Sequence, residues 1–274
     1  MKRAQWLQQT HPKVRVLAIE DTKLKDDDSE GWAKFTLDIL GYIPDAVFTS
    51  ESYGDPYAKF LGTVHVLVDR DRTHIPISAT LVRSNPIKYA EFLKNCVRAH
   101  FAKRIAVLGA ESTGTTTLSM ALAQHYKTVW VPEYGRLYSS GKVQVNKYSD
   151  WRSGEFMHIA EVQNLLEDTL AEASNGLVIC DTNAFATAVW HERFMGKPLQ
   201  ELEQQAVNRK YDLYILTGDE IPFVQDGLRD GEHIRHQMQQ RFRLRLREAN
   251  LPFLEVRGAK EKRLAAAIAA IDAV

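Results

Sequence analysis

A loop bounded by two glycines is the segment of this 274-residue sequence best suited to hold phosphate groups. The run Gly109-Ala-Glu-Ser-Thr-Gly114-Thr-Thr116 matches the pattern G-x-x-x-x-G-K-[ST] at every fixed position but one. Glycines let such a loop fold tightly, so that successive backbone N–H groups point at phosphate oxygens, and the following helix adds its positive dipole end. We therefore expect ATP to bind at the loop and first helical residues, namely Gly109, Ala110, Glu111, Ser112, Thr113, Gly114, Thr115, Thr116 and Thr117.

The exception in the pattern is Thr115, which stands where the lysine belongs. That lysine normally contacts the β- and γ-phosphates and follows the γ-group into the transition state. A threonine hydroxyl has no such charge, and the loss of one transition-state contact commonly costs ~10²–10³-fold in rate. Lys103 and Lys127 lie at the start of the preceding strand and the end of the following helix, too far away to substitute. We expect ATP binding to persist and phosphoryl transfer to be impaired.

Asp181 is the best candidate for a catalytic carboxylate, because it ends the apolar run Leu177–Cys180. An acid at the carboxyl end of a buried parallel strand lies at the ligand crevice. It could accept the proton of an attacking hydroxyl, or hold Mg²⁺ together with the Thr116 hydroxyl. The alternative is a helix N-cap, for which Thr182 and Asn183 compete. We favour the functional interpretation.

A second group of polar residues follows the short apolar segment Val129–Val131. Glu133, Tyr134 and Arg136 combine a carboxylate, an aromatic ring and a guanidinium, which together could hold a ribosyl substrate.

Two arginines near a basic helix could close over phosphates as a lid, since the planar guanidinium suits bidentate phosphate contacts. They are Arg229, in the segment Asp226–Arg229, and Arg235. The other interpretation, a solvated basic helix face, fits the later arginines better: Arg241, Arg243, Arg245 and Arg247.

In the first half of the chain, the segment Ile77–Arg83 begins a helical stretch. The hydroxyls of Ser78 and Thr80, with Arg83 one turn later, could form a phosphate pocket. A simple helix cap is equally compatible with the spacing.

Apolar runs alternate with amphipathic stretches along the whole chain, which predicts an α/β fold with a parallel sheet covered on both faces. The predicted strands are Val14–Ile19, Ala46–Thr49, Val64–Val68, Ile105–Leu108, Val129–Val131, Leu177–Cys180, Leu213–Leu216 and Phe253–Val256. The predicted helices are Glu30–Leu40, Pro86–Asn95, Thr116–His125, Gly154–Ala173, Ala184–Phe194, His233–Glu248 and Glu261–Ile271. We place a domain boundary near residues 97–104 and expect Asp26–Ser29 to cap a helix.

The overall charge argues against a nucleic-acid or membrane partner, because Lys plus Arg and Asp plus Glu both number 35. The sequence has neither the apolar stretch of a secretory signal at its start nor a run long enough to span a membrane. A cytoplasmic protein is the default expectation. Cys180 is expected to be a buried, reduced thiol. The oligomeric state is left open.

In combination these residues resemble the NadR-type bifunctional proteins of NAD salvage, which join a nicotinamide mononucleotide adenylyltransferase to a ribosylnicotinamide kinase. Ile77–Arg83 is similar to the family's adenylyltransferase motif ISxTxxR, which contacts ATP phosphates. The other segments with the family's look are Phe48–Glu51, Tyr57–Gly62, Val68–Thr73, Gly109–Thr117, Glu133–Arg136, Tyr148–Asp150 and Asp226–Arg229.

The resemblance implies a truncated Rossmann-like nucleotidyltransferase half at residues 1–100, followed by a P-loop kinase-type domain at residues 104–274. Two family features are absent: the GxFxPxHxGH-like loop, and the helix-turn-helix segment of some relatives. Asn183 also stands where a second acid is expected. The front half is therefore expected to lack adenylyltransferase activity.

For the second half, the resemblance implies ATP- and Mg²⁺-dependent phosphorylation of nicotinamide riboside. Glu133, Tyr134 and Arg136 would position the riboside, Asp181 would act as base or metal partner, and Arg229 and Arg235 would close the lid. Two alternatives are open. One is a crippled module that senses ATP or pyridine nucleotides, and the other is a different P-loop nucleoside kinase.

Overall fold

The computed structural model describes residues 2–20, 23–145, 150–229 and 231–274. It divides into two compact units, Met1–Phe92 and Leu93–Val274. The division falls before the boundary expected at residues 97–104, because helix α5 (Asn95–Phe101) packs on helix α8 (Ser153–Ala171) of the second unit.

The second unit is built on a five-stranded parallel sheet with the order β4-β5-β3-β6-β7. Its strands are β3 (Lys103–Leu108), β4 (Val129–Val131), β5 (Leu177–Asp181), β6 (Leu213–Thr217) and β7 (Phe253–Val256). All five predicted strands of this half are confirmed. Four of the five predicted runs are wholly apolar, as expected of a parallel sheet that is buried on both faces, and the edge strand β7 contains Glu255.

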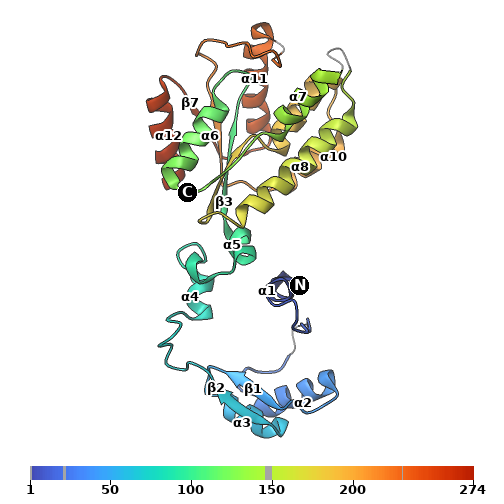
Figure 1. Cartoon of the computed structure of the whole chain (residues 1–274), viewed down its shortest axis with the longest axis vertical. Coiled ribbons are helices and arrows are strands. Elements are labelled where there is room, and N and C mark those ends of the chain that lie inside the picture. Colours follow the sequence, from blue (N-terminus) through green and yellow to red (C-terminus); the bar gives the residue numbers. More distant parts are fainter. Residues whose placement is uncertain (1, 21–22, 146–149, 230) are drawn as a thin grey trace. The chain divides into compact units, whose positions relative to one another are not determined.

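Helices cover both faces of this sheet (Figure 1). Besides α5 and α8 they are α6 (Thr115–Tyr126), α7 (Tyr134–Val145), α9 (Ala184–Met195), α10 (Gln200–Asn208), α11 (Glu232–Glu248) and α12 (Lys260–Asp272). Helices α6 and α12 pack on one face, and α8, α9 and α11 on the other. Within β3, Ile105 and Val107 point to the first face, whereas Ala106 and Leu108 point to the second.

Strand β3 is central, and the chain crosses from one side of it to the other after β5. Val107 of β3 pairs with Asp181 of β5, so the ends of these two strands lie side by side. Ligand crevices of open parallel sheets form at the carboxyl ends of the strands, where the strand order reverses. The topology therefore brings the glycine loop and Asp181 to the same crevice.

The first unit has a much smaller sheet, in which β1 (Ala46–Thr49) and β2 (Val64–Leu67) pair in parallel. Its helical elements are α1 (Lys2–Thr10), α2 (Ser29–Leu40), α3 (Gly54–Leu61), α4 (Ala79–Ser84) and the 3₁₀ turn η1 (Ala90–Phe92). Asp28 caps α2 as predicted, because its carboxylate accepts from Gly31 N at 2.8 Å.

Two predicted elements of the first unit are wrong. Residues Val14–Ile19 are not a strand, since no strand in the described part of the chain pairs with them, and Val14 and Ile19 are exposed. Pro86–Asn95 is not a helix. The Asn85 side chain accepts from Lys88 N at 3.0 Å, and this local turn replaces the helical start and leaves only the 3₁₀ turn η1. Helices α1, α3, α5, α7 and α10 were not predicted.

Candidate active site

The glycine loop joins β3 to α6 in a tight turn that only certain residues can adopt. Gly114 has φ +85° and Ser112 has φ +58°, both in the left-handed region. A Cβ atom at Gly109 would collide with the hydroxyl oxygens of Thr113 and Thr217. Glycine is therefore required at position 114 by the backbone conformation and at position 109 by close packing.

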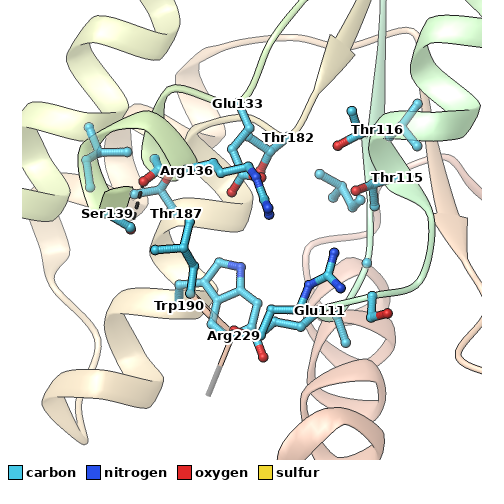
Figure 2. A pocket seen from close by; sticks show the side chains of 18 of the residues that line it. Glu111, Thr115, Thr116, Glu133, Arg136, Ser139, Thr182, Thr187, Trp190 and Arg229 are labelled. Carbon is cyan, nitrogen blue, oxygen red and sulfur yellow. Dashed lines mark hydrogen bonds between the residues drawn. The ribbon is translucent and has the colours of Figure 1, made fainter. Parts of the chain in front are cut away.

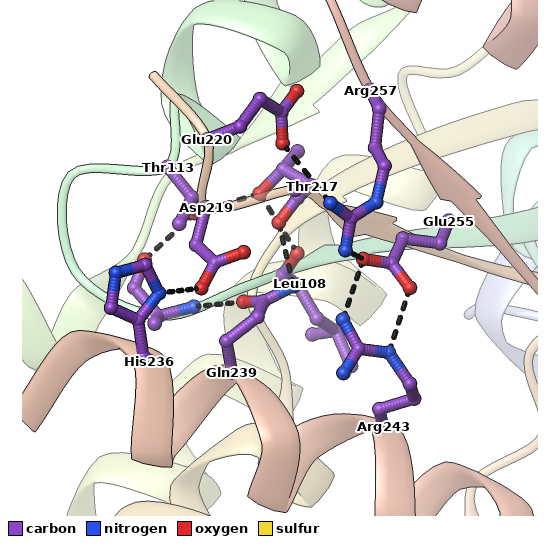
Figure 3. A network of polar contacts seen from close by, with 12 residues as sticks. Leu108, Thr113, Thr217, Asp219, Glu220, His236, Gln239, Arg243, Glu255 and Arg257 are labelled. Carbon is purple, nitrogen blue, oxygen red and sulfur yellow. Dashed lines mark hydrogen bonds and ion pairs between the residues drawn. The ribbon is translucent and has the colours of Figure 1, made fainter. Parts of the chain in front are cut away.

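A polar network beneath the loop fixes its shape (Figure 3). The Thr217 hydroxyl donates to Thr113 Oγ1 at 2.7 Å, and Thr113 in turn donates to Ala110 O at 2.7 Å. Gln239 of α11 accepts from Ala110 N at 3.1 Å and donates to Thr217 O at 2.9 Å. The Ala110 amide is therefore bonded within the protein, and the Thr113 side chain is buried. The Ala110 amide and the Thr113 side chain therefore shape the loop instead of contacting a ligand.

The loop opens onto a cavity of about 490 Å³ (Figure 2). Its wall combines the loop and start of α6 with residues of α7, α8, α9 and the segment 227–229. The predicted site residues that line it are Gly109, Ala110, Glu111, Ser112, Gly114, Thr115, Thr116, Thr117, Glu133, Arg136 and Arg229. Tyr134 is not among them: its N–H donates to Gln163 Oε1 at 2.9 Å, and its hydroxyl pairs with His158.

Asp181 lies at the end of β5 with only 1% of its surface exposed. Asn183 caps α9 by accepting from Ala186 N at 3.1 Å, so the capping role does not fall to Asp181. Burial raises the pKa of Asp181 to about 6, against hydrogen bonds from the Thr116 and Thr115 hydroxyls that lower it. Its Oδ1 has no hydrogen-bond partner among the described residues. This oxygen is placed to take a ligand or a proton.

Glu133, just after β4, is a carboxylate that lines the cavity, whereas Asp181 is buried behind the cavity residues Thr115 and Thr116. Burial raises the pKa of Glu133 to about 7, and the negative charge of Asp181 acts in the same direction. The charges of Arg136 and Arg229 oppose this rise. Near neutral pH the crevice therefore contains acids that can gain or lose a proton, a property common in catalytic sites.

The two cavity arginines share one acid. Asp226 forms an ion pair with Arg136, and its Oδ2 lies 3.3 Å from Arg229 Nε. The ion pair between Asp226 and Arg136 thus connects the segment containing Asp226 and Arg229 to α7 across the cavity. Anionic phosphate groups could compete with Asp226 for both guanidinium groups.

Thr115 occupies the lysine position, and its side chain points into the cavity (Figure 2). Neither flanking lysine lines that cavity, as expected: Lys103 Nζ donates to Val274 O at 2.7 Å, and Lys127 forms the left-handed cap of α6. Lys142 does line it, but its Nζ is paired with Glu155 at 2.8 Å.

Arg235 is placed differently from the lid residue predicted for it. It is 2% exposed and lies beneath the loop, where its Nη2 donates to Ser112 O at 3.0 Å. The solvated basic face predicted for α11 is also wrong for three of its arginines. Arg241 and Arg245 pair with Glu192 of α9, and Arg243 pairs with Glu255 of β7.

An aromatic wall at the far end of the cavity was not predicted. It consists of Trp151, Phe156, Trp190 and Phe194, which come from the residues before α8, from α8 and from α9. The Trp151 ring lies 5.0 Å from Phe156 and 5.6 Å from Phe194, and Lys142 Nζ lies 4.1 Å from the Trp151 ring centre. A planar, partly apolar group can stack on such a wall.

The remaining predicted phosphate residues belong to the first unit. Ser78 caps α4, accepting from Leu81 N at 3.1 Å, and Thr80 and Arg83 are exposed on that helix. The capping interpretation of Ser78 is confirmed. Of the family-like segment Tyr148–Asp150, the first two residues lie outside the described residues.

The described residues that line the crevice offer a metal ion only oxygen ligands. The Thr116 hydroxyl and the unpartnered Asp181 oxygen are of the kind that Mg²⁺ prefers. The described residues contain no group of three or more acidic, histidine or cysteine side chains arranged for a metal. The donor set therefore fits Mg²⁺ that arrives with phosphate and keeps water ligands.

Comparison with known proteins places these features in a family. Residues 104–263, more than half of the chain, match the family model described as AAA domain. The chain is 30% identical over 270 residues to the "Trifunctional NAD biosynthesis/regulator protein NadR" of Escherichia coli (strain K12), covering 93% of this chain and 64% of that protein. The same-named protein of Salmonella typhimurium (strain LT2) is 29% identical, with 94% and 65% covered. The chain thus spans just under two thirds of these relatives.

Two crystal structures of NadR protein have a similar fold. One is in complex with NR, with a TM-score of 0.78, 22% identity, and 99% of this chain and 81% of that chain covered. The other is in complex with NAD and AMP-PNP, with a TM-score of 0.74 and the same identity and coverage. Among the described residues, every helix is either too short or too polar to span a lipid bilayer.

Proposed function

This chain belongs to the AAA domain family through residues 104–263, and on that premise we propose that its second unit transfers a phosphoryl group from ATP to nicotinamide riboside. The product, nicotinamide mononucleotide, would enter NAD synthesis. One observation supports this above the others: a single cavity joins the glycine loop, the raised-pKa acid Glu133 and an aromatic wall, and the buried Asp181 carboxylate is hydrogen-bonded to Thr115 and Thr116 of that cavity. Similarity to NadR, and the NR and AMP-PNP named in two NadR structures, points the same way.

The phosphates of ATP would bind against the loop and the start of α6, where backbone N–H groups and the helix dipole favour anions. Ser112, Gly114, Thr115 and Thr116 line the cavity there. Thr116 would hold Mg²⁺, which when bound offsets phosphate charge, and Asp181 would take the other of the two roles predicted for it, that of the base. Arg229 and Arg136 would exchange Asp226 for phosphate oxygens as the segment around residue 227 closes.

The riboside would place its nicotinamide ring on the aromatic wall and its 5′-hydroxyl toward Asp181. The hydroxyl oxygen attacks the γ-phosphorus, the bond from that phosphorus to the β–γ bridging oxygen breaks, and ADP leaves. The hydroxyl proton passes to Asp181, whose pKa of about 6 leaves it mostly ionised at neutral pH. Glu133 and Arg136 would position the ribose.

For the first unit we infer a partial nucleotidyltransferase-like half without adenylyltransferase activity. Of the motif residues, Ser78 caps α4, and Thr80 and Arg83 lie on it. However, the described residues of this unit form only a two-stranded sheet, with little depth in which to enclose a dinucleotide. Mixing the protein with nicotinamide mononucleotide and ATP should yield no NAD, and detectable NAD would contradict the inference.

A second candidate function is a sensor that binds ATP or pyridine nucleotides without turnover. Thr115 favours it, because the loop lacks the mobile cation that follows the γ-phosphoryl group. A sensor would bind both ligands and form no product.

The test of the proposed function is a mass-spectrometric assay for nicotinamide mononucleotide with ATP, Mg²⁺ and nicotinamide riboside. Asp181→Asn should lower the rate by ~10² or more, the usual contribution of a general base. Asp168→Asn is the matched control, because Asp168 pairs with Arg209 away from the cavity. Equal rates for Asp181→Asn and the unaltered chain would remove Asp181 from the mechanism.

A further inference from the structure

Arg235 is a buried cation directly beneath the phosphate loop, and no carboxylate of the described residues is in contact with it. Its side chain is 2% exposed, and its one hydrogen bond to the described residues goes to a neutral acceptor, Ser112 O, at 3.0 Å. Its Nε has no hydrogen-bond partner among them. Phe223 covers the guanidinium, with 5.8 Å between its ring centre and Arg235 Cζ. Buried charges are normally paired, so an unpaired one calls for a counter-charge.

The charged groups that face Arg235 do not supply that counter-charge by contact. The carboxylates of Asp219 and Glu232 interact with the Arg235 guanidinium only through longer-range electrostatics. Asp219 is itself paired with His236 at 2.5 Å (Figure 3). Arg263 and Glu220 also face it, and these two are paired with each other at 2.6 Å. Burial lowers the pKa of Arg235, yet a guanidinium remains charged under all ordinary conditions.

Building on the proposed function, we propose that the counter-charge is the bound triphosphate, and that Arg235 replaces the missing loop lysine in binding. The guanidinium donates to the Ser112 carbonyl, which polarises the peptide whose N–H belongs to Thr113 and adds positive charge beneath the loop. Arg235 is a positioning residue, because it acts through the loop backbone. Fixed under the loop, it cannot follow the γ-phosphoryl group, so it restores binding without restoring turnover.

Arg263 of α12 provides a matched control. It donates from Nη1 to the next loop carbonyl, Thr113 O, at 2.7 Å, and it is similarly buried. Its charge, unlike that of Arg235, is already balanced by Glu220. Both arginines hold the loop in place through a hydrogen bond to a loop carbonyl. Only Arg235 also adds a positive charge that no carboxylate of the described residues neutralises by contact.

The test is titration of the full chain with ATP, inorganic triphosphate and adenosine, in the Thr115 and Thr115→Lys backgrounds. Arg235→Gln should weaken ATP and triphosphate binding by about tenfold or more with Thr115, since the lost interaction is charge-assisted. With Thr115→Lys the loss should shrink to roughly threefold, because the new lysine duplicates the charge. Adenosine binding should be unchanged. Arg263→Gln should cost the same factor in both backgrounds.

Arg235→Lys is the control for a folding defect, because it retains the positive charge and loses the planar guanidinium group. It should keep triphosphate affinity within about threefold of the unaltered chain, and a loss of tenfold or more would overturn the inference. An equal loss of triphosphate affinity for Arg235→Gln with Thr115 and with Thr115→Lys would also overturn the inference. Arg235 would then only maintain the shape of the loop. Absence of ATP binding to the unaltered chain would instead remove the proposed function, and this inference with it.

Discussion

The two units differ in how completely they bury their apolar residues. The second unit contains three clusters of buried apolar side chains, two on the faces of its sheet and one between α8, α9 and α10. Among the described residues of the first unit, only Ala33, Ala58 and Leu61 are buried apolar side chains, while Phe48, Val64 and other large ones are exposed. The same alternation of strand and helix therefore yields a stable scaffold only where enough strands pair to bury both faces.

The largest expected difference is in resistance to unfolding. Limited proteolysis of the full chain should cut first within Met1–Phe92 and leave a resistant fragment that begins near Leu93, because local stability follows buried contacts. Hydrogen exchange should be slowest in β3, β5 and β6. Equal protection of both units would mean that the first unit is stabilised by contacts outside the described residues.

A matched pair of phenylalanines sharpens the comparison. Phe242→Ala should destabilise the second unit by ~3–5 kcal/mol, since Phe242 is 0% exposed and its removal leaves a cavity. Phe48→Ala in β1 should change stability by less than ~0.5 kcal/mol, since Phe48 is 69% exposed. Denaturant melts of both variants check this. A large effect at Phe48 would reveal a partner surface on β1.

A smaller effect is expected at the acidic crevice of the second unit. Since the pKa of Glu133 is raised to about 7 in the folded protein, the folded state binds more protons than the unfolded state between about pH 4.5 and 7. The contribution of Glu133 to the free energy of unfolding is therefore fully present below pH 4.5 and is lost as the pH rises through 7. Glu133→Gln should stabilise the protein by ~1–2 kcal/mol at pH 8 and by nearly nothing at pH 4. Melts that show no pH dependence of this difference would contradict the raised pKa.

The sequence predicted the scaffold of the second unit because its signals are local. Four of its five strands contain an unbroken apolar run, and Phe253–Val256, which includes Glu255, has the same bounds in the structure. The loop and Asp181 met at one crevice because parallel topology brings strand ends together. By contrast, Val14–Ile19 has strand-like composition, but strand formation depends on a partner elsewhere in the chain.

The parts of the site that were missed depend on tertiary packing. The aromatic wall combines Trp151 with residues of two helices, and no local pattern links them. The burial of Arg235 against Ser112 O likewise joins positions 123 residues apart in sequence. A charged residue in a basic helix is usually exposed. The composition of the helix therefore predicted an exposed lid position for Arg235 and not a buried position beneath the loop.

The most direct test of the central claim compares nicotinamide riboside phosphorylation by the unaltered chain and by Thr115→Lys. The unaltered chain should bind ATP and form nicotinamide mononucleotide slowly, and Thr115→Lys should raise kcat by roughly 10² or more with a smaller change in ATP Kd. If ATP binds to both proteins and neither forms nicotinamide mononucleotide, the second unit is not a ribosylnicotinamide kinase, and the sensor function takes its place.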